Sequence, residues 1–415
     1  MKNIILLSIL YAGFVAQYTA NKLLTRHLDL DGLGDFNVAV SVATICAVIF
    51  VFGGDAGSNH FIPQYLKDNE WKKIKGYIVY YLILALTISF FASIISLGAD
   101  YFLRLHHLEK FLHESYFAMI LTPAFAVFLF LGALLLSLHR EYASSITTEL
   151  AKPLLFVASL YIWLLLKPSI NEYQAIVLLL ASLMITVIVQ SWLNLKSIPF
   201  NIFSQKPGMC IPEWNDVGKS MLMITLANNF VSIIDIWSLE IIHNNESSVG
   251  AFSLLVLICS IIWVNYNALY YLIASRISTN ENDTQSLQRN YTNAVMWLLA
   301  INIPTTLLII FYAEPILGWF DSDMVVYKNW LCFIAITTSV NSLLQLASPF
   351  LRFSGYARQD SIIARKVLLI SFFSSPFLVF FFGIEGAIIS SSAHLFIRGL
   401  WYSLRLKTLQ GVSLV

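Results

Sequence analysis

Charge is what this sequence has least of. Only 12% of its 415 residues are charged, whereas 58% are hydrophobic. A soluble domain carries about 25% charged and roughly 45–50% apolar residues. Because so few charged residues cannot cover a water-exposed surface of this size, the main solvent must be lipid. The composition therefore predicts an all-α, polytopic membrane protein.

Cysteine is also scarce, with four residues at positions 46, 210, 259 and 332. They form no C-x-x-C pair, so neither a disulfide framework nor a zinc site is predicted. The net charge of +1 gives no reason to expect a nucleic-acid partner.

The motifs of ATP-driven or hydrolytic chemistry are missing as well. Gly218-Lys219-Ser220 ends like a phosphate-binding loop, but Glu213 stands where that motif requires glycine. The sequence contains no H-E-x-x-H motif, and the outer loops are short. We therefore expect no enzyme activity, no metal and no bound cofactor.

Long apolar runs are what the chain has in abundance. A helix needs about 20 apolar residues to cross the hydrocarbon core. The runs predict twelve spans, at 4–25, 36–62, 76–98, 115–138, 147–167, 173–195, 217–242, 250–276, 290–313, 325–350, 362–382 and 385–404.

Lysine and arginine predict the orientation of these spans. With residue 1 in the cytoplasm, eighteen of the 25 cations fall in inside segments and six outside. This bias predicts that both termini are cytoplasmic. Arg398, within the last span, is interpreted as a cation that snorkels to the headgroups, with substrate contact as the alternative. The basic loop 352–366 is interpreted as an anchor on anionic lipid, with capture of an anionic headgroup at the inner mouth as the alternative.

A shift of 216 residues brings the two halves into register. Gly34-Asp35-Phe36 then falls on Gly250-Ala251-Phe252, unless the match is due to chance. The repeat predicts six spans in each half: residues 1–196 as an N-terminal bundle, 197–216 as a cytoplasmic linker and 217–415 as a C-terminal bundle. Transporters built from such repeats bind their substrate between the halves.

The second span contains a glycine-rich polar patch at membrane depth. Gly53, Gly54 and Gly57 would allow close helix approach and bending, and Asp55 and His60 lie among them. A carboxylate at this depth cannot face lipid. We interpret Asp55 as facing a central cavity, where its protonation could couple to transport. Neutralisation or pairing with a neighbouring helix is the alternative.

The first span carries a polar face. Gln17 and Asn21 are four residues apart, as are Lys22 and Arg26, so each pair shares a side of the helix. The cations could form a strip at the outer end or simply snorkel to the headgroups.

Polar residues recur in the second half of the chain. Asn228 and Asp235 lie seven residues apart in span seven, and Asn265 lies in span eight. Bonds between helices explain part of this pattern. Their concentration in matching spans of both halves favours a cavity.

The segments Arg26–Phe36 and Phe52–Leu66 resemble the polysaccharide and O-antigen flippases of the multidrug/oligosaccharidyl-lipid/polysaccharide flippase superfamily. The shared features are a Gly-x-Phe entry to span two, a glycine-rich polar patch and the Phe61-Ile-Pro63-x-Tyr65 exit. The family often has arginine where His60 stands. Histidine could still be charged near its usual pKa of about 6.5.

The resemblance implies two pseudo-symmetric six-helix bundles in a MATE-like V shape, with a central cavity open to one side at a time. It implies a flippase in the bacterial inner membrane that moves undecaprenyl-pyrophosphate-linked oligosaccharide to the periplasmic leaflet. Membrane lipids and other polysaccharide-assembly proteins would be its partners. Transport would be coupled to H⁺ or Na⁺, or driven passively.

On this interpretation the polar residues have three roles. Substrate binding is assigned to Lys22 and Arg26, which contact pyrophosphate, and to Gln17, Asn228 and Asn265, which face sugars. Coupling is assigned to Asp55, His60 and Asp235. The hinge consists of Gly53, Gly54 and Gly57. Two rival functions remain: a multidrug cation antiporter of the same fold, and a membrane-embedded glycan polymerase or ligase.

Overall fold

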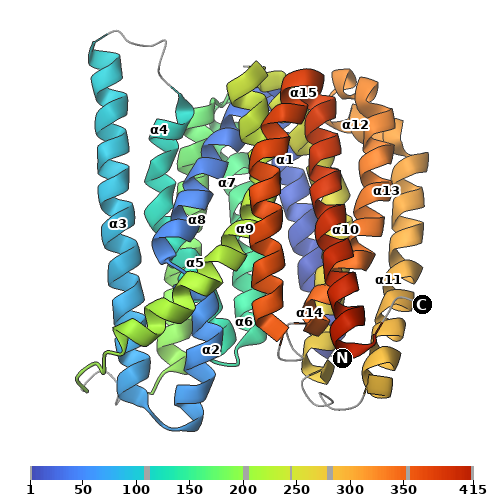
Figure 1. Ribbon diagram of the computed structural model, residues 1–415. Helices are drawn as coiled ribbons and strands as arrows, with labels where there is room; N and C mark the ends of the chain where they lie inside the picture. Colours follow the sequence, from blue (N-terminus) through green and yellow to red (C-terminus); the bar gives the residue numbers. More distant parts are fainter. Residues whose placement is uncertain are drawn as a thin grey trace. The chain divides into compact units, whose positions relative to one another are not determined.

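The computed structural model describes residues 2–106, 113–199, 205–243, 245–277, 284–351 and 356–412. Within these ranges nearly every residue is helical and none lies in a strand (Figure 1). The predicted all-α fold is confirmed.

The helices of the first half are α1 (Lys2–Val51), α2 (Gly54–Lys67), α3 (Trp71–Leu105), α4 (Glu114–Ala118), α5 (Thr122–Ser137), α6 (Glu141–Ser145), α7 (Lys152–Leu166) and α8 (Glu172–Ser197). Short 3₁₀ and π segments, η2 (Met119–Leu121) and η3 (Ile146–Ala151), join some of them. The helices of the second half are α9 (Ile211–His243), α10 (Glu246–Ile277), α11 (Thr284–Phe311), α12 (Ala313–Phe320), α13 (Lys328–Gln345), α14 (Ala347–Leu351) and α15 (Ala357–Gln410), with the 3₁₀ segment η5 (Ser322–Tyr327).

The described residues contain nine helices long and apolar enough to cross a membrane, or ten if the bent α9 is one span. Two of them are too long for one crossing. At 1.5 Å per residue, the 50 residues of α1 would cover about 75 Å against a core of about 30 Å; α1 is interrupted at Asp29. α15 is interrupted at Gly383. Counting the bent α9 as one span and dividing α1 and α15 into two spans each gives the twelve predicted spans.

The interruption in α15 reverses the chain. The side chains of Ser374 and His394 are 20 residues apart in sequence, yet their Oγ and Nε2 atoms lie 2.7 Å apart. In a straight helix they would be separated by about 30 Å. α15 is therefore a hairpin of two antiparallel spans, which we call α15a (Ala357 to Phe382) and α15b (Ile384 to Gln410).

The chain forms two compact units. The N-unit is Val15–Asn229, and the C-unit joins Met1–Phe14 to Phe230–Val415. The first part of α9 thus belongs to the N-unit and the rest to the C-unit. The bundle bounds predicted from the repeat, 1–196 and 217–415, remain a prediction.

Each unit is built around the same succession of helices. In the N-unit α5 packs against both α2 and α8, and in the C-unit α13 packs against both α10 and α15. These are the second, fourth and sixth predicted spans of each half. The parallel arrangement agrees with the expected repeat.

Span two is predicted at 36–62 with glycines that allow it to bend, and the structure breaks the helix at these glycines. The helix stops at Val51, Phe52 and Gly53 adopt positive φ angles of 55° and 74°, and α2 begins at Gly54. Glycine tolerates this left-handed conformation without steric penalty, which explains why the break falls here.

Glycines at the break permit very close contact with α9. A Cβ on Gly53 would lie 2.1 Å from the carbonyl oxygen of Gly218, and a Cβ on Gly54 would lie 2.2 Å from the ring of Tyr81. The Tyr77 hydroxyl donates to the Gly54 carbonyl at 2.8 Å. No larger residue fits at either glycine without displacing its neighbours.

The start of α9 is held in the same place by hydrogen bonds. Tyr81 donates to the Trp214 carbonyl at 3.0 Å, and the Trp214 indole donates to the Tyr65 hydroxyl at 3.0 Å. Trp214 is fully buried. We call the contact of Gly53, Gly54 and Gly218 with these aromatic residues the glycine joint.

The predicted linker 197–216 is shorter than expected. α9 already begins at Ile211, so its first turns form part of the predicted linker. Ahead of α9, the Gly208 N–H donates to the Lys72 carbonyl at 2.8 Å and the Lys75 amine donates to the Gln205 carbonyl at 2.7 Å. Residues 200–204 lie outside the described ranges.

Gly53→Ala should lower the free energy of unfolding by about 3 kcal/mol or more, because the new Cβ meets a backbone oxygen and strains a positive φ. The measurement is detergent unfolding of the purified protein followed by tryptophan emission. Gly98→Ala in α3 is the control, since no atom lies within 4 Å of its added Cβ. Equal stability of both variants would contradict the tight contact.

Candidate functional site

The polar face of the first span is exposed at its middle and at its outer end. Gln17 and Arg26 are exposed, and Lys22 is half-buried. The Asn21 amide donates to the Gln17 backbone carbonyl at 3.0 Å, so it bonds within its own helix. Because an exposed amide at mid-membrane is costly in hydrocarbon, Gln17 requires a polar surrounding.

The remaining predicted residues of the N-unit lie near the glycine joint or on α9. Asp55 is half-buried in the first turn of α2, where a carboxylate is favoured by the helix dipole. His60 is exposed and its ring contacts the edge of Phe61. Asn228 is also exposed. All three side chains are thus accessible, at least in part.

In the C-unit, Asn265 is buried in a chain of polar side chains. Its Oδ1 accepts from the Tyr11 hydroxyl, and its Nδ2 donates to Asn302 Oδ1 at 2.8 Å. Asn302 in turn donates to the Ser342 hydroxyl at 2.8 Å. This chain links α1, α10, α11 and α13, and it uses both ends of the Asn265 amide.

Asp235 is the centre of a second buried cluster. The carboxylate is fully buried and accepts from the Ser375 hydroxyl of α15a. Ser390 of α15b lies close to the carboxylate, and Ser238 lies 3.3 Å from the Ser375 hydroxyl. We call Asp235 with Ser238, Ser375, Ser390 and His394 the Asp235 cluster.

His394 joins the cluster from α15b. Its Nδ1 lies 3.4 Å from the Ser390 hydroxyl and its Nε2 lies 2.7 Å from the hydroxyl of Ser374. The second oxygen of Asp235, Oδ2, is buried and has no hydrogen-bond partner within the described chain. Carboxylate and hydroxyl oxygens suit a small hard cation, while imidazole and carboxylate both accept protons.

The sequence pattern indicates Asp235 as a site residue but does not indicate the serine and histidine residues around it. Serine and histidine within apolar spans were not singled out, although the spacing of Ser390 and His394 places both on one face of α15b. What the sequence could not indicate is that α15a, α15b and α9 meet at this point.

Arg398 does not snorkel as expected. Its side chain is only 8% exposed and lies within the C-unit. Of the basic loop 352–366, residues 352–355 lie outside the described ranges, and Arg358, Arg365 and Lys366 are exposed.

One further group in the N-unit could hold an ion. Ligand atoms of Asp35, His113 and Glu114 lie within 4.8 Å of one another. However, His113 Nδ1 accepts from the Ser115 N–H at 3.0 Å. In a neutral ring the proton then sits on Nε2, so metal binding there would disrupt this cap.

No model of a protein family matches the chain, and no curated protein sequence matches it. Solved structures do. An inward-facing multidrug resistance MATE family transporter of the MOP superfamily is similar over 99% of both chains, with a TM-score of 0.69 and 16% identity. The lipid II flippase MurJ in an inward closed conformation is similar over 97% of this chain and 87% of its own, with a TM-score of 0.73 and 16% identity.

A MATE transporter in an outward-facing conformation also matches, over 100% of both chains with a TM-score of 0.62 and 15% identity. The chain is therefore a multi-pass membrane protein with a MATE-like helical fold. At these identities the likeness concerns the fold.

Asn302→Ala should lower the free energy of unfolding by about 2 kcal/mol, because it leaves the buried Asn265 amide without its acceptor. The same unfolding assay measures the change. Asn267→Ala is the matched control, since Asn267 is exposed two residues from Asn265 on α10. If both variants were equally stable, the polar chain would not stabilise the C-unit.

Proposed function

We propose that this protein is a flippase of the bacterial inner membrane that carries undecaprenyl-pyrophosphate-linked oligosaccharide, an O-antigen or other surface polysaccharide unit, by alternating access. The observation that supports it is a fold similar to that of a lipid II flippase, in a chain whose polar groups divide into an exposed set and a buried set.

The exposed set suits the substrate. A sugar chain with two phosphates cannot enter hydrocarbon, so it needs polar side chains along its route while the prenyl tail stays in lipid. Lys22 and Arg26 would contact the pyrophosphate, and Gln17 and Asn228 would donate to sugars. Asn265 is assigned to the sugars as well, which requires that its bonds to Tyr11 and Asn302 exchange during the cycle.

The buried set suits energy coupling. In our proposal a proton or Na⁺ enters the Asp235 cluster and changes how α9 bonds to α15a and α15b. α9 is pinned at its start by the glycine joint and bends at Ser232. It could therefore pass a change at Asp235 to the N-unit. Asp55 and His60 would respond at the N-unit end, with Gly53, Gly54 and Gly57 as the hinge.

The second candidate is a multidrug cation antiporter, favoured by the equally extensive fold likeness to MATE transporters. A glycan polymerase or ligase is the rival from another class. These three functions can be distinguished by the leaflet in which the lipid-linked repeat unit accumulates in a deletion strain. The flippase predicts accumulation in the inner leaflet, the polymerase or ligase in the outer leaflet, and the antiporter none.

Lys22→Ala and Arg26→Ala should each slow glycan display about tenfold or more, since each removes a charge-assisted bond to phosphate. Surface glycan labelled over time in the complemented deletion strain is the readout. Lys167→Ala is the control, because Lys167 is exposed in a different loop and stacks on Trp163. Normal display in both test variants would refute the assigned pyrophosphate contacts.

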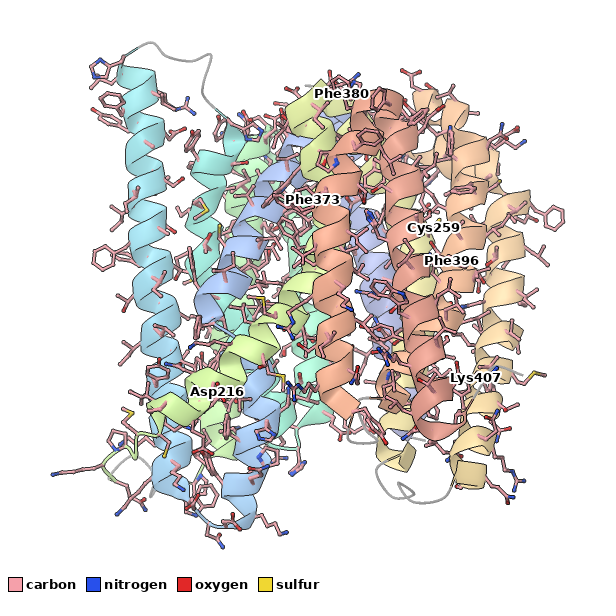
Figure 2. The ribbon with its side chains drawn as sticks, viewed as in Figure 1. Asp216, Cys259, Phe373, Phe380, Phe396 and Lys407 are labelled. Carbon is pink, nitrogen blue, oxygen red and sulfur yellow. The ribbon has the colours of Figure 1, made fainter. Side chains whose placement is uncertain are left out.

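Asp235→Asn should remove the dependence of transport on the ion gradient, because an amide neither releases a proton nor balances a cation. Flipping in proteoliposomes with and without imposed H⁺ and Na⁺ gradients measures this. Asp216→Asn is the matched control: Asp216 is exposed on the first part of α9 (Figure 2). Retained gradient dependence in Asp235→Asn would place coupling elsewhere.

A further inference from the structure

An open groove of about 430 Å³ lies between α15a and α15b, at the end of the hairpin opposite its turn. α15a contributes Gln359, Ile362 and Lys366, and α15b contributes Trp401, Leu404 and Arg405. We call it the α15 groove. It lies wholly within the C-unit, and neither the Asp235 cluster nor the exposed polar set includes its residues.

The α15 groove is cationic. Lys366 and Arg405 are both exposed and make no ion pair within the described part of the chain, and none of the lining residues is acidic. The nearest acid in sequence, Asp360, is 1% exposed and accepts from Ser348, so its carboxyl is turned into the unit. Two cations that line one groove without an acidic partner favour an anionic ligand.

The groove continues directly into an apolar stripe. Along α15a, Lys366 is followed at helical spacing by Leu369, Phe373 and Phe377, which are 61%, 72% and 61% exposed. Along α15b, Leu404 is 57% exposed and Leu400 is 37% exposed. Figure 2 shows Phe373 and Phe380 farther along the hairpin, away from the end that carries Lys407. Such a surface faces lipid tails.

Trp401 lies where the two regions meet. The Lys366 amine is 6.0 Å from the centre of its ring, within reach of a cation–π contact. Tryptophan is enriched at the boundary between headgroups and hydrocarbon. The predicted orientation places this end of α15 in the cytoplasmic leaflet.

We propose that the α15 groove binds an anionic phospholipid of the cytoplasmic leaflet. Its phosphodiester would lie between Lys366 and Arg405, and its acyl chains would follow the apolar stripe. The charge complementarity and the order of cations, tryptophan and apolar stripe match a phospholipid from head to tail. Apart from the Trp401 indole, Gln359 and Thr408 are the uncharged polar groups among its described lining residues, which suits a small headgroup better than an oligosaccharide. The proposal does not depend on what the protein transports.

The test uses the full chain in phosphatidylcholine nanodiscs that contain a minor fraction of phosphatidylglycerol with brominated acyl chains. Bromine quenches nearby tryptophan emission. The chain has 10 tryptophans, so the difference between wild type and Trp401→Phe isolates the Trp401 signal. We expect brominated phosphatidylglycerol to quench that signal at a lower mole fraction than brominated phosphatidylcholine does.

The double variant Lys366→Gln/Arg405→Gln should weaken the apparent affinity for phosphatidylglycerol about 30-fold, at about fivefold for each lost cation. Arg365→Gln/Lys407→Gln is the matched control, because it removes two exposed cations of the same hairpin end that do not line the groove. If brominated phosphatidylcholine quenches the double variant as strongly as the wild type, Trp401 still faces lipid and the variant is folded.

Three results would overturn the proposal. They are equal quenching by the two brominated lipids in the wild type, an equal loss of affinity in the control variant, and displacement of phosphatidylglycerol by stoichiometric undecaprenyl pyrophosphate. The last result would assign the groove to a polyprenyl substrate instead. Loss of glycan display in the variants is not used as a readout, so the outcome is independent of the proposed flippase activity.

Discussion

Hydrocarbon offers no partner for a hydrogen bond, and this constraint shapes the interior of both units. A polar side chain inside such a protein must be bonded to another part of the chain or face water. In the C-unit, Asn265, Asn302 and Ser342 bond to one another in sequence. Asp235 is surrounded by serine hydroxyls from both arms of the α15 hairpin. The helices that carry these groups are therefore fixed relative to one another more specifically than apolar packing alone would achieve.

In the N-unit, glycine residues allow close contact between helices. Gly53 and Gly218 let the break after α1 touch the backbone of α9, and Tyr81 and Trp214 close around the contact. Because the first part of α9 is bound in the N-unit while Asp235 and His243 on its second part bond within the C-unit, one helix belongs to both. In the proposed mechanism this helix would connect ion binding with substrate access.

Exposure separates the polar residues in a way that the proposed mechanism uses. Gln17, Arg26 and Asn228 are exposed, whereas Asn265 and Asp235 are buried. The proposed substrate contacts and the proposed coupling site would therefore have different locations. The α15 groove belongs to a third environment, since it combines unneutralised cations with an apolar stripe that faces the bilayer.

Composition and hydropathy alone were enough to predict an all-helical membrane protein of about twelve spans, because apolar runs of about 20 residues have the length of a helical crossing. The glycine patch at 53–57 and the carboxylate at Asp235 were also visible in the sequence, as polar or small residues in apolar runs. The contact between Gly53 and Gly218, which are more than 160 residues apart in sequence, was not visible. Nor were Ser375, Ser390 and His394 recognisable as partners of Asp235. Residues far apart in sequence meet only when helices pack, and one sequence contains no record of which helix faces which; tertiary structure alone decided that.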